Sequence, residues 1–336
     1  MVKRNIFLIY IFLFCCNFIM GNDYIPYTTD APSVTLELNN QKAIFLIDTG
    51  SKVSLIPLRT IKKLNLDKTS LFIEFNNYSY DKKRHQEDAK ELEQLIGSMF
   101  GINTENNEAP KKYIPNKKYV PSFKNVHIGS EMLKELKLTY IELYDEKKDR
   151  FVINDENIDA VLSYDETKED NYDGILGLDV ISQFRNITVD YRRKRIAFNS
   201  NYEFKTEPIR VLHEIPNEYN VQLYDNRFYI PLNIENNLIF GLLDTGNRSD
   251  YIILPVKLKN VLKTDTDFID SFFTVNIDFA NKIKEKLAAL YFDSKYVISL
   301  YEDEILNSFG VSLIGSGLFS KHIIQFDFEN DMFRME

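Results

Sequence analysis

The sequence predicts an all-β fold made of two similar lobes related by a pseudo-two-fold axis, with few short helices. Apolar segments run twice into Asp-Thr-Gly, as I-F-L-I-D-T-G at 44–50 and I-F-G-L-L-D-T-G at 239–246. Later in each half, at 173–184 and 311–322, an apolar pair is followed by a glycine and by a segment that we expect to form a short helix. Apolar residues then recur with the period of two that is typical of strands. We therefore expect the same set of elements to occur once in each half.

Residues 1–21 have the pattern of a signal peptide. A short basic start, M-V-K-R-N, precedes an apolar run that is short for a membrane span. We therefore expect a secreted, periplasmic or envelope protein. An uncleaved anchor or a lipoprotein is the alternative, although the bulky Phe14 stands before Cys15 where a lipid-attachment site needs small residues. The only cysteines, Cys15 and Cys16, lie in this segment, so a chain cleaved after it has no disulfide and no thiolate chemistry.

Charge and histidine spacing exclude two classes of function. The net charge of -9 gives no basic surface for nucleic acid. The four histidines are scattered without the spacing of metal ligands, at His85, His127, His213 and His322. We therefore expect no nucleic-acid partner, no metal and no cofactor.

The first lobe is predicted to span residues 22–206, beginning with a strand over S-V-T-L-E-L. Gly177 stands 129 positions after Asp48, whereas Gly315 stands only 71 positions after Asp244. The first lobe therefore carries an insertion, which we place near 76–122. Its charged, amphipathic sequence favours a solvent-exposed segment over one that binds a partner.

Each lobe is predicted to end in a β-hairpin. Ile187, Val189 and Tyr191 alternate with polar residues before the turn R-R-K, as expected of a half-buried strand. The same pattern recurs after Gly315, with E-N-D as the turn. A linker is expected at 207–220, and the second lobe at 207–336.

The doubled Asp-Thr-Gly predicts a pair of acids. A strand that stops at Asp-Thr-Gly places a carboxylate at its end, and the glycine permits a sharp turn. One such motif is ordinarily a surface turn. In repeated lobes, however, Asp48 and Asp244 would face each other. Two carboxyl groups at such a short distance cannot both ionise.

These four blocks resemble the pepsin and retropepsin clan of aspartic proteases. G-I-L-G-L-D-V-I-S-Q-F followed by a strand ending V-D-Y is most similar to the single-chain, two-lobed bacterial retropepsin-like secreted proteins. The resemblance implies an acid-protease barrel fold and an aspartic endopeptidase that cleaves an extended peptide or protein substrate between the lobes. It also implies a monomer, because both half-sites lie in one chain.

The resemblance also implies roles for individual residues. Asp48 and Asp244 would hold the attacking water, one as general base and the other as the protonated acid. The residues implied to support them are Thr49 and Thr245, which cross-brace the lobes, Gly50 and Gly246, which let the loops approach the water, and Gly177 and Gly315, which pack beneath the loops. Tyr113 and Tyr119 are candidates for the flap tyrosine, although Pro115 and Pro121 indicate loop around them.

Ser51 and Asn247 follow the two motifs and differ in chemistry. The family commonly has a hydroxyl residue here that donates to the neighbouring carboxylate, as Ser51 could. Asn247 has two interpretations: its amide donates to Asp244 instead, or its side chain only serves the bend.

Two other functions remain open from the sequence. A catalytically inactive peptide-binding protein could have the same fold, since a fold does not guarantee chemistry. A purely structural envelope protein is the third possible function, after the endopeptidase and the peptide-binding protein.

Overall fold

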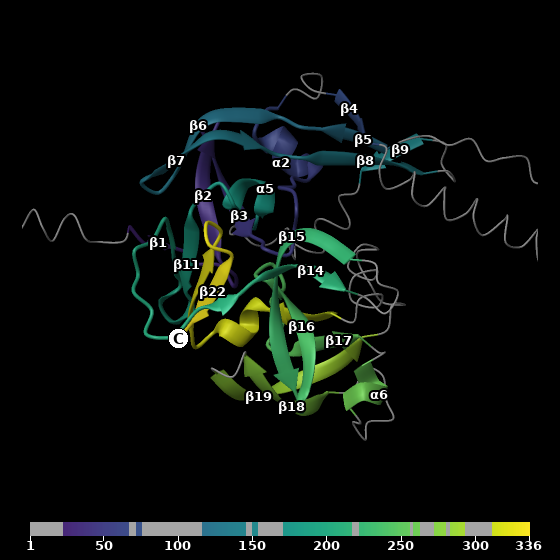
Figure 1. Ribbon diagram of the computed structural model, residues 1–336. Helices are drawn as coiled ribbons and strands as arrows, with labels where there is room; N and C mark the ends of the chain where they lie inside the picture. Colours follow the sequence, from purple (N-terminus) through teal and green to yellow (C-terminus); the bar gives the residue numbers. More distant parts are fainter. Residues whose placement is uncertain are drawn as a thin grey trace, which may run out of the picture.

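The computed structural model describes residues 23–66, 72–75, 116–145, 150–153, 171–216, 222–255, 258–262, 272–279, 283–292 and 311–336. The described part is mostly β, as the sequence predicts, and its helices are short. They are α2 (Leu58–Lys63), α5 (Leu178–Ile181), α6 (Lys259–Leu262) and the 3-10 helices η1 (Tyr191–Arg193) and η5 (Ser316–Phe319). In Figure 1 most strands of the first half, drawn in purple to blue, lie above the green strands of the second half.

Three sheets make up the upper part. The first has the order β10-β3-β2, from β2 (Ser33–Leu38), β3 (Gln41–Ile47) and β10 (Gly174–Leu176). A two-stranded sheet joins β6 (Ser122–Ile128) to β7 (Glu131–Lys137). The third has the order β4-β5-β8-β9, from β4 (Phe72–Phe75), β5 (Asn116–Tyr119), β8 (Tyr140–Asp145) and β9 (Arg150–Ile153).

The second half is built on one larger sheet with the order β14-β15-β16-β20-β17-β19-β18. A further pairing of β15 with β18 closes six of these strands into a barrel. The strands are β14 (Leu212–Pro216), β15 (Gln222–Ile234), β16 (Asn237–Asp244), β17 (Ile252–Pro255), β18 (Phe273–Phe279), β19 (Ile283–Phe292) and β20 (Val311–Gly315).

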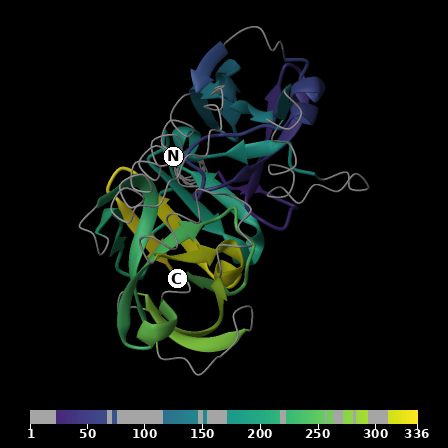
Figure 2. The same ribbon diagram turned by 90° about the vertical axis from the view of Figure 1, so that its right-hand side faces the viewer.

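A six-stranded sheet joins the two halves, in the order β1-β12-β11-β21-β22-β13. The predicted terminal hairpins are both present in it and meet where β11 pairs with β21. Figure 2 shows the yellow strands of this sheet between the upper and lower parts. Its strands are β1 (Ile25–Pro26), β11 (Asn186–Asp190), β12 (Arg195–Phe198), β13 (Ile209–Arg210), β21 (Ile323–Asp327) and β22 (Met332–Met335).

The central strands are more buried than their alternation suggests. Every residue of β11 and β21 is buried, including the polar ones between the apolar positions, so the prediction of half-buried strands is wrong. The polar side chains on the second face make hydrogen bonds, as most buried polar groups do, although Asn186 Oδ1 has no partner among the described residues. Gln325, for example, donates to Thr188 Oγ1 at 3.0 Å, and Asn186 donates to the carbonyl of Ser200.

The structure adds detail to three of these predictions. The C-terminal end of the segment where the insertion is predicted, near 76–122, contains β5 and the start of β6, which are both paired strands. Tyr119 ends strand β5, so the loop predicted around it is wrong. The linker expected at 207–220 contains β13 and β14, and Ile209 is buried against β22.

The remaining predictions on these segments lie outside the described residues. They include the signal peptide at 1–21, the charged, amphipathic part of the insertion and Tyr113. Of the helices in the described ranges, none has the length and apolar character that a membrane crossing needs.

Candidate active site

Parallel strand pairs place both acids of the repeated motif at strand ends. Asp48 directly follows β3, and its N–H donates to the carbonyl of Leu176 at the end of β10. In the second half, β16 ends at Asp244, which pairs with Gly315 of the parallel strand β20. The apolar residues before each acid bury these strands in the interior, so the carboxyl groups emerge from rigid elements.

Each acid is held by its own loop through equivalent hydrogen bonds. The N–H groups of Gly50 and Ser51 donate to Asp48 Oδ1 at 2.8 and 3.0 Å. Those of Gly246 and Asn247 donate to Asp244 Oδ1 at 2.8 and 3.1 Å. These bonds fix both carboxyl groups in orientation before any ligand arrives.

The two acids meet across the halves. Their side chains are joined by a hydrogen bond, and the residues are only 6% and 5% exposed. Each carboxyl also lies against the glycine of the opposite loop: a Cβ on Gly50 would come within 3.0 Å of the Asp244 carboxyl, and one on Gly246 equally close to that of Asp48. The structure therefore brings Asp48 and Asp244 together, with a glycine on either side.

The two threonines exchange hydrogen bonds beneath the acids. Thr49 Oγ1 accepts from the N–H of Thr245 at 3.1 Å and donates to the carbonyl of Leu243 at 2.8 Å. Thr245 Oγ1 accepts from the N–H of Thr49 at 3.1 Å and donates to the carbonyl of Ile47 at 2.6 Å. Because both threonines are fully buried, these four bonds tie the two strand ends together with no competition from water.

The two later glycines lie against the loops that hold the acids. A Cβ on Gly177 would meet the backbone of Ser51 and Val53, and one on Gly315 would meet the carbonyls of Asn247 and Ser249. The chain passes so close at these points that only glycine fits. Ser54 is a further support that no sequence pattern indicated: its hydroxyl accepts from the N–H of Gly177 and donates to Asp179.

Burial raises the pKa of Asp244. Removal from water is the largest cause, because it disfavours the charged carboxylate. The hydrogen bond with Asp48, the backbone N–H groups of Asn247 and Gly246, and the positive charge of Arg227 act in the opposite direction. Because burial prevails, Asp244 holds its proton to higher pH than an exposed aspartate does.

The side chain of Asn247 stabilises a turn. Its Oδ1 accepts from the N–H of Ser249 at 2.9 Å, which directs the amide group into the loop. The donor to Asp244 is the backbone N–H of Asn247. Ser51 behaves alike, since its hydroxyl donates to the carbonyl of Val53 and its backbone N–H to Asp48. Of the two interpretations of Asn247, the structure favours the bend.

Arg227 is a residue of this site that sequence reasoning missed. It lies in β15, is only 1% exposed, and its Nη1 is 3.4 Å from the carbonyl oxygen of Gly50. No local sequence signal could reveal it, because Arg227 lies 177 positions from Gly50 along the chain.

Of the two flap candidates, Tyr119 is the last residue of β5, and the structure describes only its backbone position.

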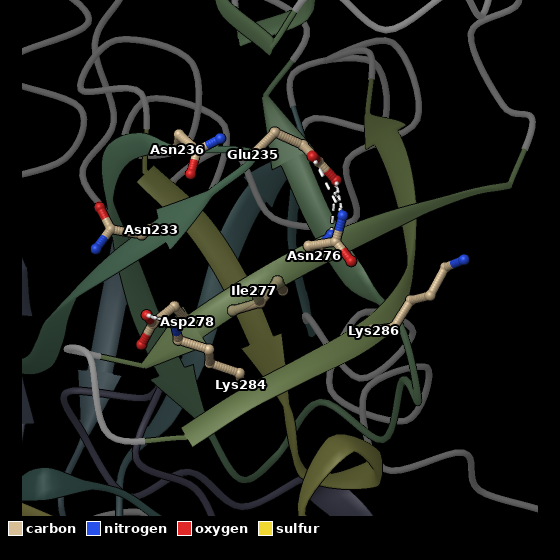
Figure 3. Close-up of a pocket in the computed structure, with 8 residues that line it drawn as sticks. All are labelled: Asn233, Glu235, Asn236, Asn276, Ile277, Asp278, Lys284 and Lys286. Atoms are coloured by element: carbon tan, nitrogen blue, oxygen red, sulfur yellow. Dashed lines mark hydrogen bonds and ion pairs between the residues drawn. The ribbon is translucent and has the colours of Figure 1, made fainter.

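A polar hollow of about 700 Å³ lies elsewhere, on the barrel of the second half. Figure 3 shows it between β15, β18 and β19, where the carboxylate of Glu235 accepts hydrogen bonds from Asn276. None of the residues that support the acid pair lines it; the lining residues are Asn233, Glu235, Asn236, Asn276, Ile277, Asp278, Lys284 and Lys286. Within the described ranges, no three His, Cys, Asp or Glu residues are grouped so that they could hold a metal ion.

No known protein-family model matches the chain, and no curated protein matches it either. The interpretation of the site therefore depends on its geometry.

Proposed function

We propose that the protein is an aspartic endopeptidase with the two-lobed fold of the pepsin and retropepsin clan. One observation carries the proposal: two buried aspartates from equivalent strand ends share a hydrogen bond, above threonines that brace each other reciprocally. A purely structural role would not explain two acids side by side, because burying two carboxyl groups next to each other costs free energy. The arrangement suits chemistry that needs one protonated and one ionised carboxyl.

We assign the protonated role to Asp244, because burial raises the pKa of its carboxyl group. Asp244 carries the shared proton and donates it toward the carbonyl oxygen of the scissile bond, while ionised Asp48 takes a proton from the attacking water. The new C–O bond makes a tetrahedral diol. When the C–N bond breaks, Asp48 gives its proton to the leaving amine nitrogen and a diol hydroxyl returns one to Asp244. Both acids are thereby restored, and no other group enters the balance.

The substrate in this proposal is an extended peptide or protein that lies between the two halves of an exported monomer. Several side chains of the substrate then contribute to specificity, instead of one anchor residue.

Cleavage of a diverse peptide mixture from acidic to neutral pH tests the proposal. The expected result is internal cleavage by the mature wild-type chain, with products identified by mass spectrometry. Release of single terminal residues alone would contradict the endopeptidase assignment. Binding of extended peptides without hydrolysis at any pH would favour the inactive peptide-binding protein instead.

A further inference from the structure

Arg227 brings a positive charge to an otherwise symmetric site. The Arg227 residue is 1% exposed, and Nη1 donates a long hydrogen bond of 3.4 Å to the carbonyl of Gly50. Gly50 is the residue whose Cα faces the Asp244 carboxyl. The guanidinium also lies 5.9 Å from the centre of the Tyr229 ring. It thus lies beside the loop that follows Asp48, close enough to Asp244 for its charge to act on that carboxyl group.

The equivalent position in the first half has no charge. Strand pairing sets Ser33 opposite Leu46 and Tyr229 opposite Leu242, and each of these leucines stands two residues before its aspartate. Two residues before Ser33 is the buried Ala31, where the second half has Arg227. The backbone hydrogen bonds to the acids are equivalent, so Arg227 makes the site electrostatically asymmetric.

A buried guanidinium needs negative charge nearby, because it stays ionised and burial without a partner is costly. Among the described residues, the titratable groups that act on Asp244 include Asp48 across the halves, Arg227 from β15 and Tyr191 from η1. Tyr191 supplies no charge, because burial raises its pKa well above 10.0. The acid pair is therefore a source of negative charge beside Arg227, and Arg227 in turn favours that charge.

We infer that Arg227 is a positioning residue that stabilises the single negative charge of the Asp48–Asp244 pair, and so extends the ionised state toward lower pH. Its catalytic consequence rests on the proposed function. The electrostatic coupling between Arg227 and the pair does not, and it can be measured on the folded protein without any substrate.

The first test measures the free energy of unfolding against pH for the full chain and three variants. Arg227→Met removes the charge at similar volume, Arg227→Lys keeps it, and Arg210→Met is a control at an exposed residue of β13. Without the cation, the folded pKa of the pair rises further above its unfolded value, so the folded state binds more protons. Stability then falls more as pH rises. The Met variant is expected to lose least stability in acid and most near neutral pH, while the Lys and Arg210 variants run parallel to wild type.

The second test uses hydrolysis of a peptide that the wild type cleaves. The acid limb of the rate profile should move up by about 1 pH unit or more in Arg227→Met, because a nearby opposite charge lowers a carboxyl pKa by roughly 1–3 units. Arg227→Lys should restore most of the wild-type limb. A merely structural role would lower activity without moving the limb.

The outcomes separate the two proposals. Absence of hydrolysis in the wild type, with the expected pH-dependent penalty in Arg227→Met, would overturn the peptidase and leave the role of Arg227 standing. A penalty in Arg227→Met that is equal at every pH, up to complete unfolding, would overturn the role of Arg227. So would equal effects of the Met and Lys variants.

Discussion

At the residue scale, Asn247 and Ser51 occupy equivalent positions after the two motifs but bind through different atoms. Asn247 accepts through its side chain from Ser249, whereas Ser51 donates through its hydroxyl to Val53. In both halves the aspartate accepts a hydrogen bond from the backbone N–H of this residue. The chemical difference between Asn and Ser therefore has little effect on the acids.

Asn247→Ala is expected to leave the acid limb of the rate profile in place. It should cost about 1 kcal/mol of stability, because one side-chain hydrogen bond in the turn is lost. Urea unfolding and the pH dependence of kcat/KM check both parts, and Ser51→Ala is the matched variant in the other half. An upward shift of the acid limb in folded Asn247→Ala would show that its amide acts on Asp244 after all.

Asp244→Asn is expected to gain stability relative to wild type as pH rises. Because burial raises the pKa of Asp244 above 3.8, the folded wild type binds more protons than the unfolded chain, so its stability falls as pH rises through the folded pKa. Asn cannot ionise and avoids this loss. Denaturant unfolding at several pH values measures it, with the exposed Asp30→Asn as control. If the Asp244→Asn curve ran parallel to wild type, or fell below it with rising pH, the raised pKa would be wrong.

At the element scale, local patterns predicted the strands before each acid, the short helices after Gly177 and Gly315 and the two hairpins. These depend on near neighbours in the chain. Alternation could not show that β11 and β21 are buried on both faces, because that depends on how the sheet between the halves is covered. Nor could it place β5, which pairs with β4 across residues 76–115.

The closeness of the two loops leads to a prediction for Gly50 and Gly246. Alanine at either position would put a Cβ within 3.0 Å of the opposite carboxyl. The acids must then separate, and we expect kcat/KM to fall by about 100-fold or more, as misplacement of about 1 Å can do. Gly241→Ala is the control, since its Cβ would meet only the side chains of Ile314 and Leu232 among its nearest atoms. It should cost stability and keep most of the activity per folded molecule; equal activity losses in all three variants would contradict the prediction.

At the scale of the whole molecule, the pairing of β11 with β21 and the threonine brace hold the two halves in one arrangement. The repeat in the sequence predicted that Asp48 and Asp244 would face each other, and the structure brings them together. Arg227 could not be predicted in the same way, because it has no counterpart in the first half. A repeat reveals what two halves share, and the asymmetry between them requires the three-dimensional structure.

The most direct test of the central claim is the rate of peptide hydrolysis in Asp48→Asn and Asp244→Asn, with Asp30→Asn as the exposed control and far-UV circular dichroism as the check on folding. Each of the first two variants should lose activity by at least about 1,000-fold while it stays folded, because a single acid cannot serve both proton roles. The Asp30 variant should match wild type. If either Asp48→Asn or Asp244→Asn kept most of the wild-type rate, the two aspartates would not be the catalytic pair.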